Sequence, residues 1–308
     1  MKKIFWILIA IIYVILLFYI FSPERIQTDS GKIDLFFCQK TNCSSIIVQL
    51  IQQAQNIKCV FYDLDEPNVL IALNQPKVET LIFKENYEGL FTPVTSKGLM
   101  HDKFCVFDEK IVLTGSWNPT MRGTYYNDNN VILIYSKKIS EAYLKEFERI
   151  KTGKSHKGNY QINLSGTYVQ LCFSPIGNCE EKIISTLSEA KQEILFLTFT
   201  FTSEKIGEIL ISKFKENVEV TGVFEKSKIS QYSVYSDLKN LGMKVYLDEN
   251  KYNMHHKLFL IDGEVLIIGS YNPTKSANTV NDENTLIIQN KNMAYKIQEE
   301  FSRIKSLI

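Results

Sequence analysis

The sequence predicts an α/β protein in which two homologous lobes, each a mainly parallel sheet flanked by helices, are related by a pseudo-twofold axis and preceded by one transmembrane helix. Three observations lead to this prediction: an internal repeat, alternating strand-like and helix-like segments, and an apolar run near the first residue. Of the 308 residues, 45% are hydrophobic and 22% are charged, which excludes a disordered chain and a disulfide miniprotein. Lysine and arginine (35) balance aspartate and glutamate (34), so any phosphate-binding surface must be local.

The apolar run covers residues 4–21, after Lys2 and Lys3 and before Pro23. A helix over it would be about 27 Å long, enough to cross the hydrocarbon core of a bilayer. The run is longer than the apolar core of a usual signal peptide, and no small-x-small cleavage site follows it. We therefore expect an uncleaved anchor over residues 1–22 rather than a cleaved signal or a core helix. The two lysines predict a single-pass membrane protein with its N-terminus inside and the rest of the chain extracytoplasmic.

The repeat rests on one segment that occurs twice, as MHDKFCVFDEKIVLTGSWNPT from Met100 and as HHKLFLIDGEVLIIGSYNPT from His255. The same interval of 154 residues separates His101 from His255 and still holds in the helix-like stretch that follows, where FERI matches FSRI. Upstream, the dipeptide Asn-Cys at 42–43 matches the one at 178–179. The repeat therefore covers nearly all of the chain beyond the apolar run.

These boundaries divide the chain into an anchor (1–22), a first lobe (23–150), a linker (151–166) and a second lobe (167–308). The linker is polar and contains glycine. Two homologous lobes are expected to pack about a pseudo-twofold axis, as two copies of a homodimer do.

Within the second copy, hydrophobic periodicity predicts strand 194–201, helix 203–217, strand 218–224, helix 232–241 and strand 243–247. The repeated segment predicts a pair of consecutive strands in each copy, at 104–107 and 111–113 and at 258–261 and 265–268. The first copy is shorter between its upstream cysteine and its motif histidine. We therefore expect it to lack one helix–strand unit.

Four of the six cysteines form two pairs that are close in sequence, Cys38 with Cys43 and Cys172 with Cys179. Each pair is either a local disulfide of an oxidising compartment or two free thiols. A zinc site is the least favoured interpretation, because no matching His or Cys pair stands near either one. Cys59 and Cys105 lie in apolar, strand-like runs, and we expect them to be buried and free.

Each copy of the repeated segment has the pattern H-x-K-x4-D-x6-G-S-x-N. Its residues are His101, Lys103, Asp108, Gly115, Ser116 and Asn118 in the first copy and His255, Lys257, Asp262, Gly269, Ser270 and Asn272 in the second. Alternate side chains of a strand share a face, so the histidine and the lysine point the same way. The chain turns at the aspartate and returns, which brings the Gly-Ser-x-Asn end beside the histidine. An imidazole, an ammonium, a hydroxyl and an amide then converge and can form half of a phosphate-binding site.

This pattern resembles the phospholipase D superfamily, whose signature is the same motif in two copies. The resemblance covers residues 32 to 305. It implies that the two motifs face each other and form one active site, so that no dimer is required. It also implies a phosphodiester substrate, with one histidine attacking phosphorus to form a phosphohistidine and the other protonating the leaving oxygen. No metal or other cofactor is implied, because two lysines and two asparagines neutralise the phosphoryl oxygens.

The resemblance assigns catalytic roles to the histidine, lysine and asparagine of each motif, namely His101, Lys103, Asn118, His255, Lys257 and Asn272. Asp108 and Asp262 are expected to be structural and to orient the strand ends at the turns. Ser116 and Ser270 either bond the phosphate or cap the turn.

Downstream of the motifs, the copies differ at one position that bears on the roles of the histidines. The second copy has Glu283 where the first has Asn129. In the superfamily a carboxylate near this point usually bonds a catalytic histidine, often the one of the opposite lobe. If the pairing crosses the lobes, Glu283 makes His101 more basic, which favours His101 as the nucleophile and His255 as the acid.

Two other histidines and three basic residues receive structural interpretations. His256 is expected to be packed or exposed on the opposite face of its strand, and His156 to be solvated in the linker. Lys97, Arg122 and Lys275 stand near the motifs and either extend a phosphate-binding surface or are solvated charges.

The motif specifies the reaction class more closely than the substrate. A nuclease is the first hypothesis, because lobes this short resemble the minimal bacterial nucleases of the superfamily. A phospholipase D or phosphatidyl transferase is the alternative, in which the anchor would hold the site at the bilayer. A phosphate-binding module without activity is the third hypothesis, and two intact motifs argue against it. A basic, aromatic-lined groove would favour a nuclease, and an apolar ring around the site would favour a lipid enzyme.

Overall fold

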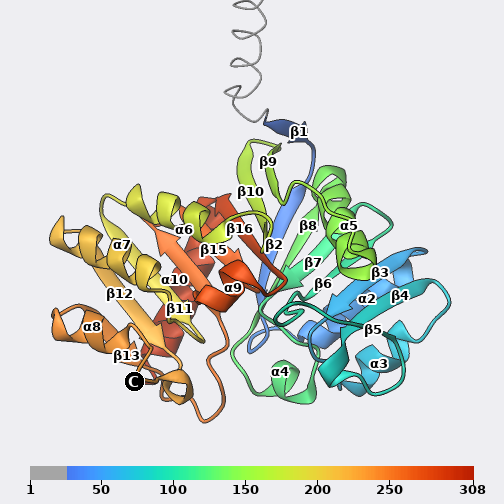
Figure 1. Cartoon of the computed structure of the whole chain (residues 1–308), viewed down its shortest axis with the longest axis horizontal. Coiled ribbons are helices and arrows are strands. Elements are labelled where there is room, and N and C mark those ends of the chain that lie inside the picture. Colours follow the sequence, from blue (N-terminus) through green and yellow to red (C-terminus); the bar gives the residue numbers. More distant parts are fainter. Residues whose placement is uncertain (1–25) are drawn as a thin grey trace, which may run out of the picture.

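The computed structural model describes residues 26–308, which form two lobes side by side (Figure 1). The first lobe contains β2 (Lys32–Phe37), α2 (Cys43–Gln53), β3 (Ile57–Phe61), α3 (Pro67–Leu73), β4 (Val78–Phe83), η1 (Lys84–Asn86), β5 (Thr92–Val94), β6 (Phe104–Phe107), β7 (Ile111–Gly115), α4 (Met121–Tyr125), β8 (Asn130–Tyr135) and α5 (Lys137–Thr152). The second contains β10 (Thr167–Ser174), α6 (Cys179–Ser188), β11 (Glu193–Thr198), α7 (Glu204–Lys215), β12 (Glu219–Phe224), η2 (Lys226–Lys228), α8 (Tyr235–Asn240), β13 (Lys244–Leu247), β14 (Lys257–Ile261), β15 (Val265–Gly269), α9 (Lys275–Thr279), β16 (Glu283–Gln289) and α10 (Lys291–Lys305).

Both sheets are mixed. The strand order is β2-β8-β7-β6-β3-β4-β5 in the first lobe and β1-β9-β10-β16-β15-β14-β11-β12-β13 in the second, where β1 (Gln27–Asp29) and β9 (Asn159–Leu164) extend the sheet. Neighbours are parallel only in β3-β4-β5, β11-β12-β13 and β1-β9. The prediction of mainly parallel sheets is therefore wrong. Each motif is itself a hairpin, β6–β7 or β14–β15, and consecutive hairpin strands must be antiparallel.

Helices α5 and α10, which end the two lobes, begin at side chains that cap them. Ser136 Oγ accepts from the Ile139 N–H, and Asn290 Oδ1 accepts from the Met293 N–H. α5 ends at Gly153, whose φ of 78° is the left-handed conformation that glycine adopts without strain. Both helices therefore have fixed starting points, which sets where their side chains lie against the sheets.

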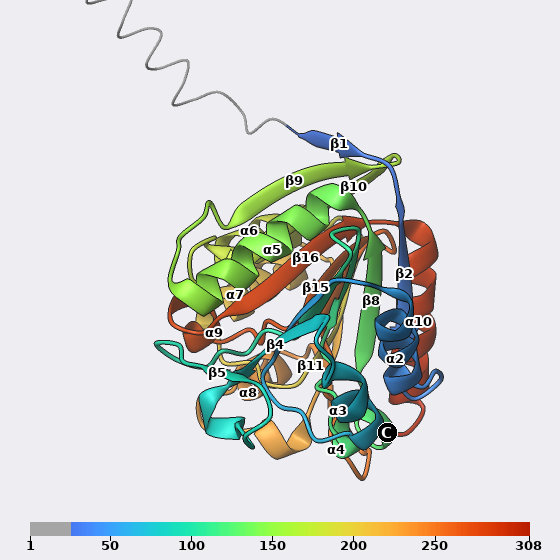
Figure 2. The same cartoon turned by 90° about the vertical axis from the view of Figure 1, so that its right-hand side faces the viewer.

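One hydrophobic core lies between the two sheets. It includes Val60 and Val106 of the first lobe and Leu197 and Leu258 of the second, together with the apolar faces of α5 and α10. Each of these helices also contacts the sheet of the other lobe: α10 lies beside β2 (Figure 2), and α5 contacts β1 and β9. Separate apolar clusters lie under α2 and α3 and under α6, α7 and α8. The shared core joins the lobes into one unit.

The lobes differ by less than a helix–strand unit. The first lobe lacks a counterpart of α8, but it keeps the strand: β5 pairs in parallel with β4 as β13 pairs with β12. Within the predicted linker, 151–166, residues Asn159–Leu164 form β9 and pair with β10. The predicted domain boundaries remain predictions.

All six cysteines form disulfides: Cys38–Cys43, Cys59–Cys105 and Cys172–Cys179. The expectation that Cys59 and Cys105 are free is wrong. Strands β3 and β6 pair antiparallel with Cys59 directly opposite Cys105, so both side chains leave the sheet on one face within bonding reach. The single-strand pattern of the sequence does not reveal this register.

The prediction of single-pass membrane localisation is also corrected. Among residues 26–308 there is no helix with both the length and the apolar character needed to cross a membrane. The predicted anchor over residues 1–22 lies outside the described residues. The localisation prediction is wrong on this finding, and the geometry of the two lobes does not depend on it.

Candidate active site between the lobes

At the end of the second strand of each motif hairpin, a glycine lies unusually close to the backbone of the neighbouring strand. Gly115 and Gly269 have φ values of 144° and 157°. A Cβ atom on either would lie 2.3 Å from the carbonyl oxygen of the neighbouring strand, on Asn130 or Asn284 respectively. Only glycine fits there. The serine and asparagine that follow in each motif are thereby carried to the end of the sheet beside the histidines.

Both motifs contribute to a single cavity of about 520 Å³. Of the predicted residues, those lining it are His101, Asn118, Arg122, Asn129, His255 and Asn272. The side-chain oxygens of both motif asparagines, Asn118 and Asn272, are buried and have no hydrogen-bond partner within residues 26–308. Because buried amides are normally satisfied, these two are free to bind a ligand.

Each histidine is bonded by the opposite lobe. His101 Nδ1 lies 2.8 Å from Glu283 Oε2, and His255 Nδ1 lies 2.8 Å from Asn129 Oδ1. Ser270 Oγ donates to Glu283 at 2.7 Å, and Ser116 Oγ donates to Asn129 at 3.0 Å. The serines thus orient the histidine partners. Since both partners accept, each histidine carries its hydrogen on Nδ1 and presents a free Nε2.

The motif lysines lie beneath the histidines. Lys103 and Lys257 are 1% and 3% exposed. Each ammonium donates to the carbonyl of its own motif histidine, at 2.9 Å for Lys257. Each also lies about 5 Å from the centre of an aromatic ring, at 5.1 Å from Tyr62 and 5.0 Å from Phe199.

Burial and charge hold both imidazoles neutral. Burial lowers the pKa of His101 to about 4, although Glu283 opposes the shift. Burial, Lys257 and Lys103 lower the pKa of His255 well below its usual value, and its hydrogen-bond partner across the lobes is the neutral amide of Asn129. Burial also lowers the pKa of Lys103 to about 8 and that of Lys257 well below its usual range. Burial alone would raise the pKa of Glu283, but His101, Lys103 and Ser270 lower it, so this group is a carboxylate.

Asp108 and Asp262 lie away from the cavity, at the turns of the two hairpins. Both have left-handed backbones, with φ of 49° and 50°. Asp108 Oδ1 accepts from the N–H groups of Gln55 and Asn56, which lead into β3. Asp262 likewise accepts from the N–H groups of residues 191–193, where β11 begins. They fix the motif hairpin to its neighbouring strand.

The lining residues that the sequence interpretation missed include Tyr62, Asp63, Phe199 and Lys228. The ring of Tyr62 lies 4.9 Å from that of His101, and Phe199 lies 4.4 Å from His255. Both rings directly follow the strand next to the motif hairpin, β3 or β11. Sequence comparison misses them because their interval differs from the 154 residues of the motif.

Arg122 lines the cavity, whereas Lys97 is exposed outside it and Lys275 lines a separate one. His256 is buried and packs its ring 5.5 Å from Phe37. The expectation that His156 is solvated is wrong: its side chain is 6% exposed, because it bonds to Glu146.

A family model described as "Cardiolipin synthase, PLD-like domain" matches the chain twice, over residues 33–151 and 183–305. A phospholipase D of Rickettsia prowazekii (strain Madrid E) is 30% identical over 166 residues, which cover 51% of this chain and 81% of that protein. A mitochondrial cardiolipin hydrolase of Chlamydomonas reinhardtii is 26% identical over 124 residues, which cover 40% of this chain and 56% of that protein. The fold is shared with phosphatidylserine synthase from Haemophilus influenzae Rd KW20 (TM-score 0.67, 12% identity, 89% of this chain and 85% of that chain).

Proposed function

The chain belongs to the family of PLD-like domains and is a phosphodiesterase of the phospholipase D superfamily, and from this premise we propose that it cleaves nucleic acid through a phosphohistidine without a metal ion. The observation that carries the chemistry is the pair of neutral imidazoles in one cavity, each bonded through Nδ1 to the opposite lobe. Each presents Nε2 toward the space that a phosphodiester would occupy.

In the first step Nε2 of His101 attacks phosphorus, and the bond from phosphorus to the leaving oxygen breaks. His255 gives the leaving oxygen a proton, and the Nδ1 hydrogen of His101 stays on its bond to Glu283. In the second step water attacks the phosphohistidine, His255 takes the proton of the water, and His101 leaves phosphorus as a neutral imidazole. Protons and charge balance over the two steps.

His101 is the nucleophile in this proposal because its imidazole becomes positively charged when it is phosphorylated. Glu283 is a buried carboxylate 2.8 Å away and stabilises that charge. The amide of Asn129 gives His255 no such support. The pKa of His255 is low because of burial and of the lysines nearby. The anionic phosphate of a bound substrate counters those lysines, so that His255 takes up the proton it must donate.

The charge that develops on the phosphoryl oxygens needs donors fixed in advance. Asn118 and Asn272 line the cavity from the two lobes, and Lys103 and Lys257 lie below the histidines. Ammonium and amide groups placed in this way can replace a divalent cation in neutralising a phosphoryl group.

The polar and aromatic lining of the cavity supports nucleic acid as the substrate. Two rings, Tyr62 and Phe199, stand on either side of it, and Arg122 and Lys228 supply exposed positive charge at its rim. Rings that stack bases and cations that follow the backbone are the usual elements of single-strand binding.

A membrane phospholipid is the second candidate, favoured by apolar side chains near the cavity. Leu99 lines it and is 36% exposed, and Met121, next to Arg122, is 42% exposed. Asp63 and Asp65 also line the cavity, and their negative charges would repel a polyanion. Relatives named phospholipase D and cardiolipin hydrolase point the same way.

The test incubates the full-length protein with EDTA and, in parallel, with end-labelled single-stranded DNA, single-stranded RNA or phospholipid vesicles. We expect nucleotide fragments, and none from a His101→Asn protein whose thermal melt matches that of the parent. Released head group with intact nucleic acid would move the assignment to lipid. Cleavage that EDTA abolishes and a divalent ion restores would contradict the metal-free mechanism.

A further inference from the structure

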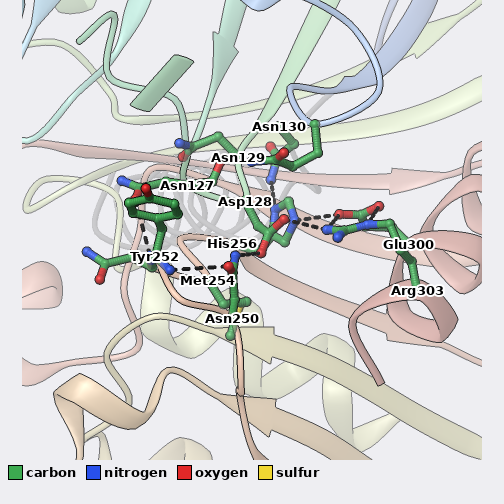
Figure 3. Close-up of polar contacts among 12 residues, drawn as sticks. Asn127, Asp128, Asn129, Asn130, Asn250, Tyr252, Met254, His256, Glu300 and Arg303 are labelled. Carbon is green, nitrogen blue, oxygen red and sulfur yellow. Dashed lines mark hydrogen bonds and ion pairs between the residues drawn. The ribbon is translucent and has the colours of Figure 1, made fainter. Parts of the chain in front are cut away.

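Asp128 of the first lobe holds the strand end that carries His255. Its carbonyl oxygen accepts from the His255 N–H at 2.9 Å, and its own N–H donates to the Asn253 carbonyl at 2.9 Å. Its carboxylate, 1% exposed, accepts from Asn250 Nδ2 at 2.6 Å and from the guanidinium of Arg303 in α10 (Figure 3). Backbone and side chain of Asp128 are thus both bound by the second lobe.

Arg303 is in turn fixed by Glu300, one turn earlier in α10. Its Nε and Nη2 donate to the two carboxylate oxygens of Glu300 at 2.9 and 2.6 Å. Glu300 also lies 3.2 Å from His256 Nε2, and His256 Nδ1 accepts from Asn130 Nδ2 at 2.9 Å, which returns the contacts to the first lobe (Figure 3). A planar guanidinium held by two acids has one allowed orientation. We call Asp128, Arg303 and Glu300 the His255 clamp.

The same arrangement recurs in the other half-site. The carbonyl of Asp282 in the second lobe accepts from the His101 N–H at 2.9 Å. The carboxylate of Asp282 accepts at 2.6 Å from Arg149 of α5, which also donates to Glu146 at 2.9 and 2.5 Å. We call Asp282, Arg149 and Glu146 the His101 clamp. Each member stands 154 residues from its counterpart.

The residues that bond the catalytic imidazoles sit next to the clamp aspartates. Asn129, the partner of His255, directly follows Asp128, and Glu283, the partner of His101, directly follows Asp282. Movement of a clamp aspartate would therefore shift the backbone of one histidine and the side chain that orients its ring together.

We propose that Arg149 and Arg303 are positioning residues, each of which sets the orientation of one catalytic histidine through the aspartate it binds in the opposite lobe. Arg149 acts on His101, and Arg303 acts on His255. This inference rests on the proposed function for the chemical roles of the two histidines, whereas the contacts themselves do not depend on it.

The first test compares two phosphodiesters, one with a p-nitrophenyl leaving group, which departs without a proton, and a matching one with an alkyl leaving group. Arg303→Met should lower kcat/KM about 100-fold for the alkyl substrate and leave kcat/KM nearly unchanged for the aryl substrate, because kcat/KM reports the first step, in which only the alkyl leaving group needs the acid. Arg149→Met should slow both substrates by a similar factor, because it disturbs the nucleophile. Arg303→Lys and Arg149→Lys keep the positive charge and should recover part of the rate.

The second test is independent of the reaction and measures amide hydrogen exchange at the two histidines. Arg303→Met should speed exchange at the His255 N–H and leave that of His101 unchanged, and Arg149→Met should do the reverse. Lys213→Met removes a similar ion pair with Glu216, at 2.6 Å inside α7, and should change neither exchange rate nor the ratio of the two substrate rates.

The outcomes separate the clamps from the histidine roles. If His255→Asn lowers kcat/KM equally for the aryl and alkyl substrates, the assignment of the acid fails, and the exchange measurement still decides on the clamps. If the two arginine variants change exchange equally at both histidines, or at neither, while the thermal melt shows folded protein, the positioning proposal is overturned.

Discussion

The two lobes repeat the same elements, yet they differ at three buried polar positions. At two of them another residue restores the lost hydrogen bond or ion pair, and at the third none does. The first compensated pair joins the start of a helix to the loop after a strand. In the first lobe Ser44 donates to Glu66 at 2.9 Å, and in the second Ser203 donates to Glu180 at 2.7 Å. Hydroxyl and carboxylate have exchanged places. The two lobes therefore share this hydrogen bond, although neither of the two residues that form it is the same.

The second difference concerns the histidine that bonds the glutamate of the last helix in each lobe, and a residue outside the repeat makes up for it. His256 bonds Glu300 in the second lobe, but the residue at the equivalent place in the first lobe is Asp102, a second buried acid beside Glu146. Burial and Glu146 raise the pKa of Asp102 well above its usual range. In the first lobe it is His156 that bonds Glu146, with 2.7 Å between His156 Nε2 and Glu146 Oε2. The folded state thus restores the pairing through a residue of a different segment.

The difference between Glu283 and Asn129 has no such counterpart. Each lies 2.8 Å from the Nδ1 of a catalytic histidine, and no carboxylate reaches His255 from elsewhere in residues 26–308. In the proposed mechanism this uncompensated difference distinguishes the nucleophile, His101, from the acid, His255.

The largest expected effect comes from exchanging this pair. Glu283→Asn should lower kcat about 10³-fold, since it removes the charge that stabilises phosphorylated His101. Asn129→Glu combined with Glu283→Asn should restore part of the rate and move the trapped phosphohistidine from His101 to His255. Phosphoryl-enzyme quenched in alkali and mapped by peptide mass gives the position. A label that stays on His101 in the double variant would show that the carboxylate does not choose the nucleophile.

The next largest effect concerns the stability of the first lobe. Cys59–Cys105 joins β3 to β6 over a sequence separation of 46, whereas the second lobe has the ring pair Phe196 and Phe259 at the matching register. Replacing both cysteines by valine should cost about 4 kcal/mol of unfolding free energy. The Cys38–Cys43 loop has a separation of 5, and its removal should cost roughly 2 kcal/mol, which makes it the control. Equal losses in urea unfolding would contradict the loop-length argument.

The pH profile distinguishes the two half-sites more finely. Since the pKa of folded His101 is lowered to about 4, kcat/KM should fall as the pH drops through that value and the nucleophile is protonated. Glu283→Gln should move this limb to lower pH, because the carboxylate raises the pKa of His101. Folding stability should also decrease as the pH falls from 6.5 toward 4, where unfolded histidine binds a proton and folded His101 does not. A limb that moves upward in the variant would refute the assigned interaction.

The smallest expected effect is at Asp248, whose carboxylate is buried and forms no hydrogen bond of normal geometry within residues 26–308, although the nearby backbone N–H of Asn250 offsets part of the effect of burial. The first lobe has Val94 there. Burial raises the pKa of Asp248 to about 6, so its ionisation destabilises the fold as the pH rises above 4 toward neutrality. Asp248→Val should raise the melting temperature at pH 7 by about 2–4 °C and by less at pH 4. A lower melting temperature would show that the carboxylate is needed.

The sequence predicted which residues lie together at the candidate site more closely than it predicted the directions of the strands. Two motifs at a fixed interval located both histidines, both asparagines and the partner Glu283, because these residues belong to the repeat. Strand direction was mispredicted, since the antiparallel order depends on how the hairpin joins the sheet. The pairing of Cys59 with Cys105 was missed because it is set by the register between two strands that are 46 residues apart in sequence. The pairing of His156 with Glu146 was missed because the path of the chain after α5 brings His156 to Glu146, and the polar composition of that segment does not reveal it. Tyr62 and Phe199 were not predicted, because the segments between them and the motifs differ in length in the two lobes and the two residues are therefore not 154 residues apart.

The bridges between the lobes have a consequence for the time at which this enzyme becomes active. Met100 pairs with Asp282 and Met254 with Asp128, so each catalytic strand is completed by the other half of the molecule. A nascent chain that has folded only its first lobe contains His101 but neither Glu283 nor the backbone that orients it. In the proposed mechanism such a chain is inactive while it is being synthesised, and its activity begins when the two halves dock.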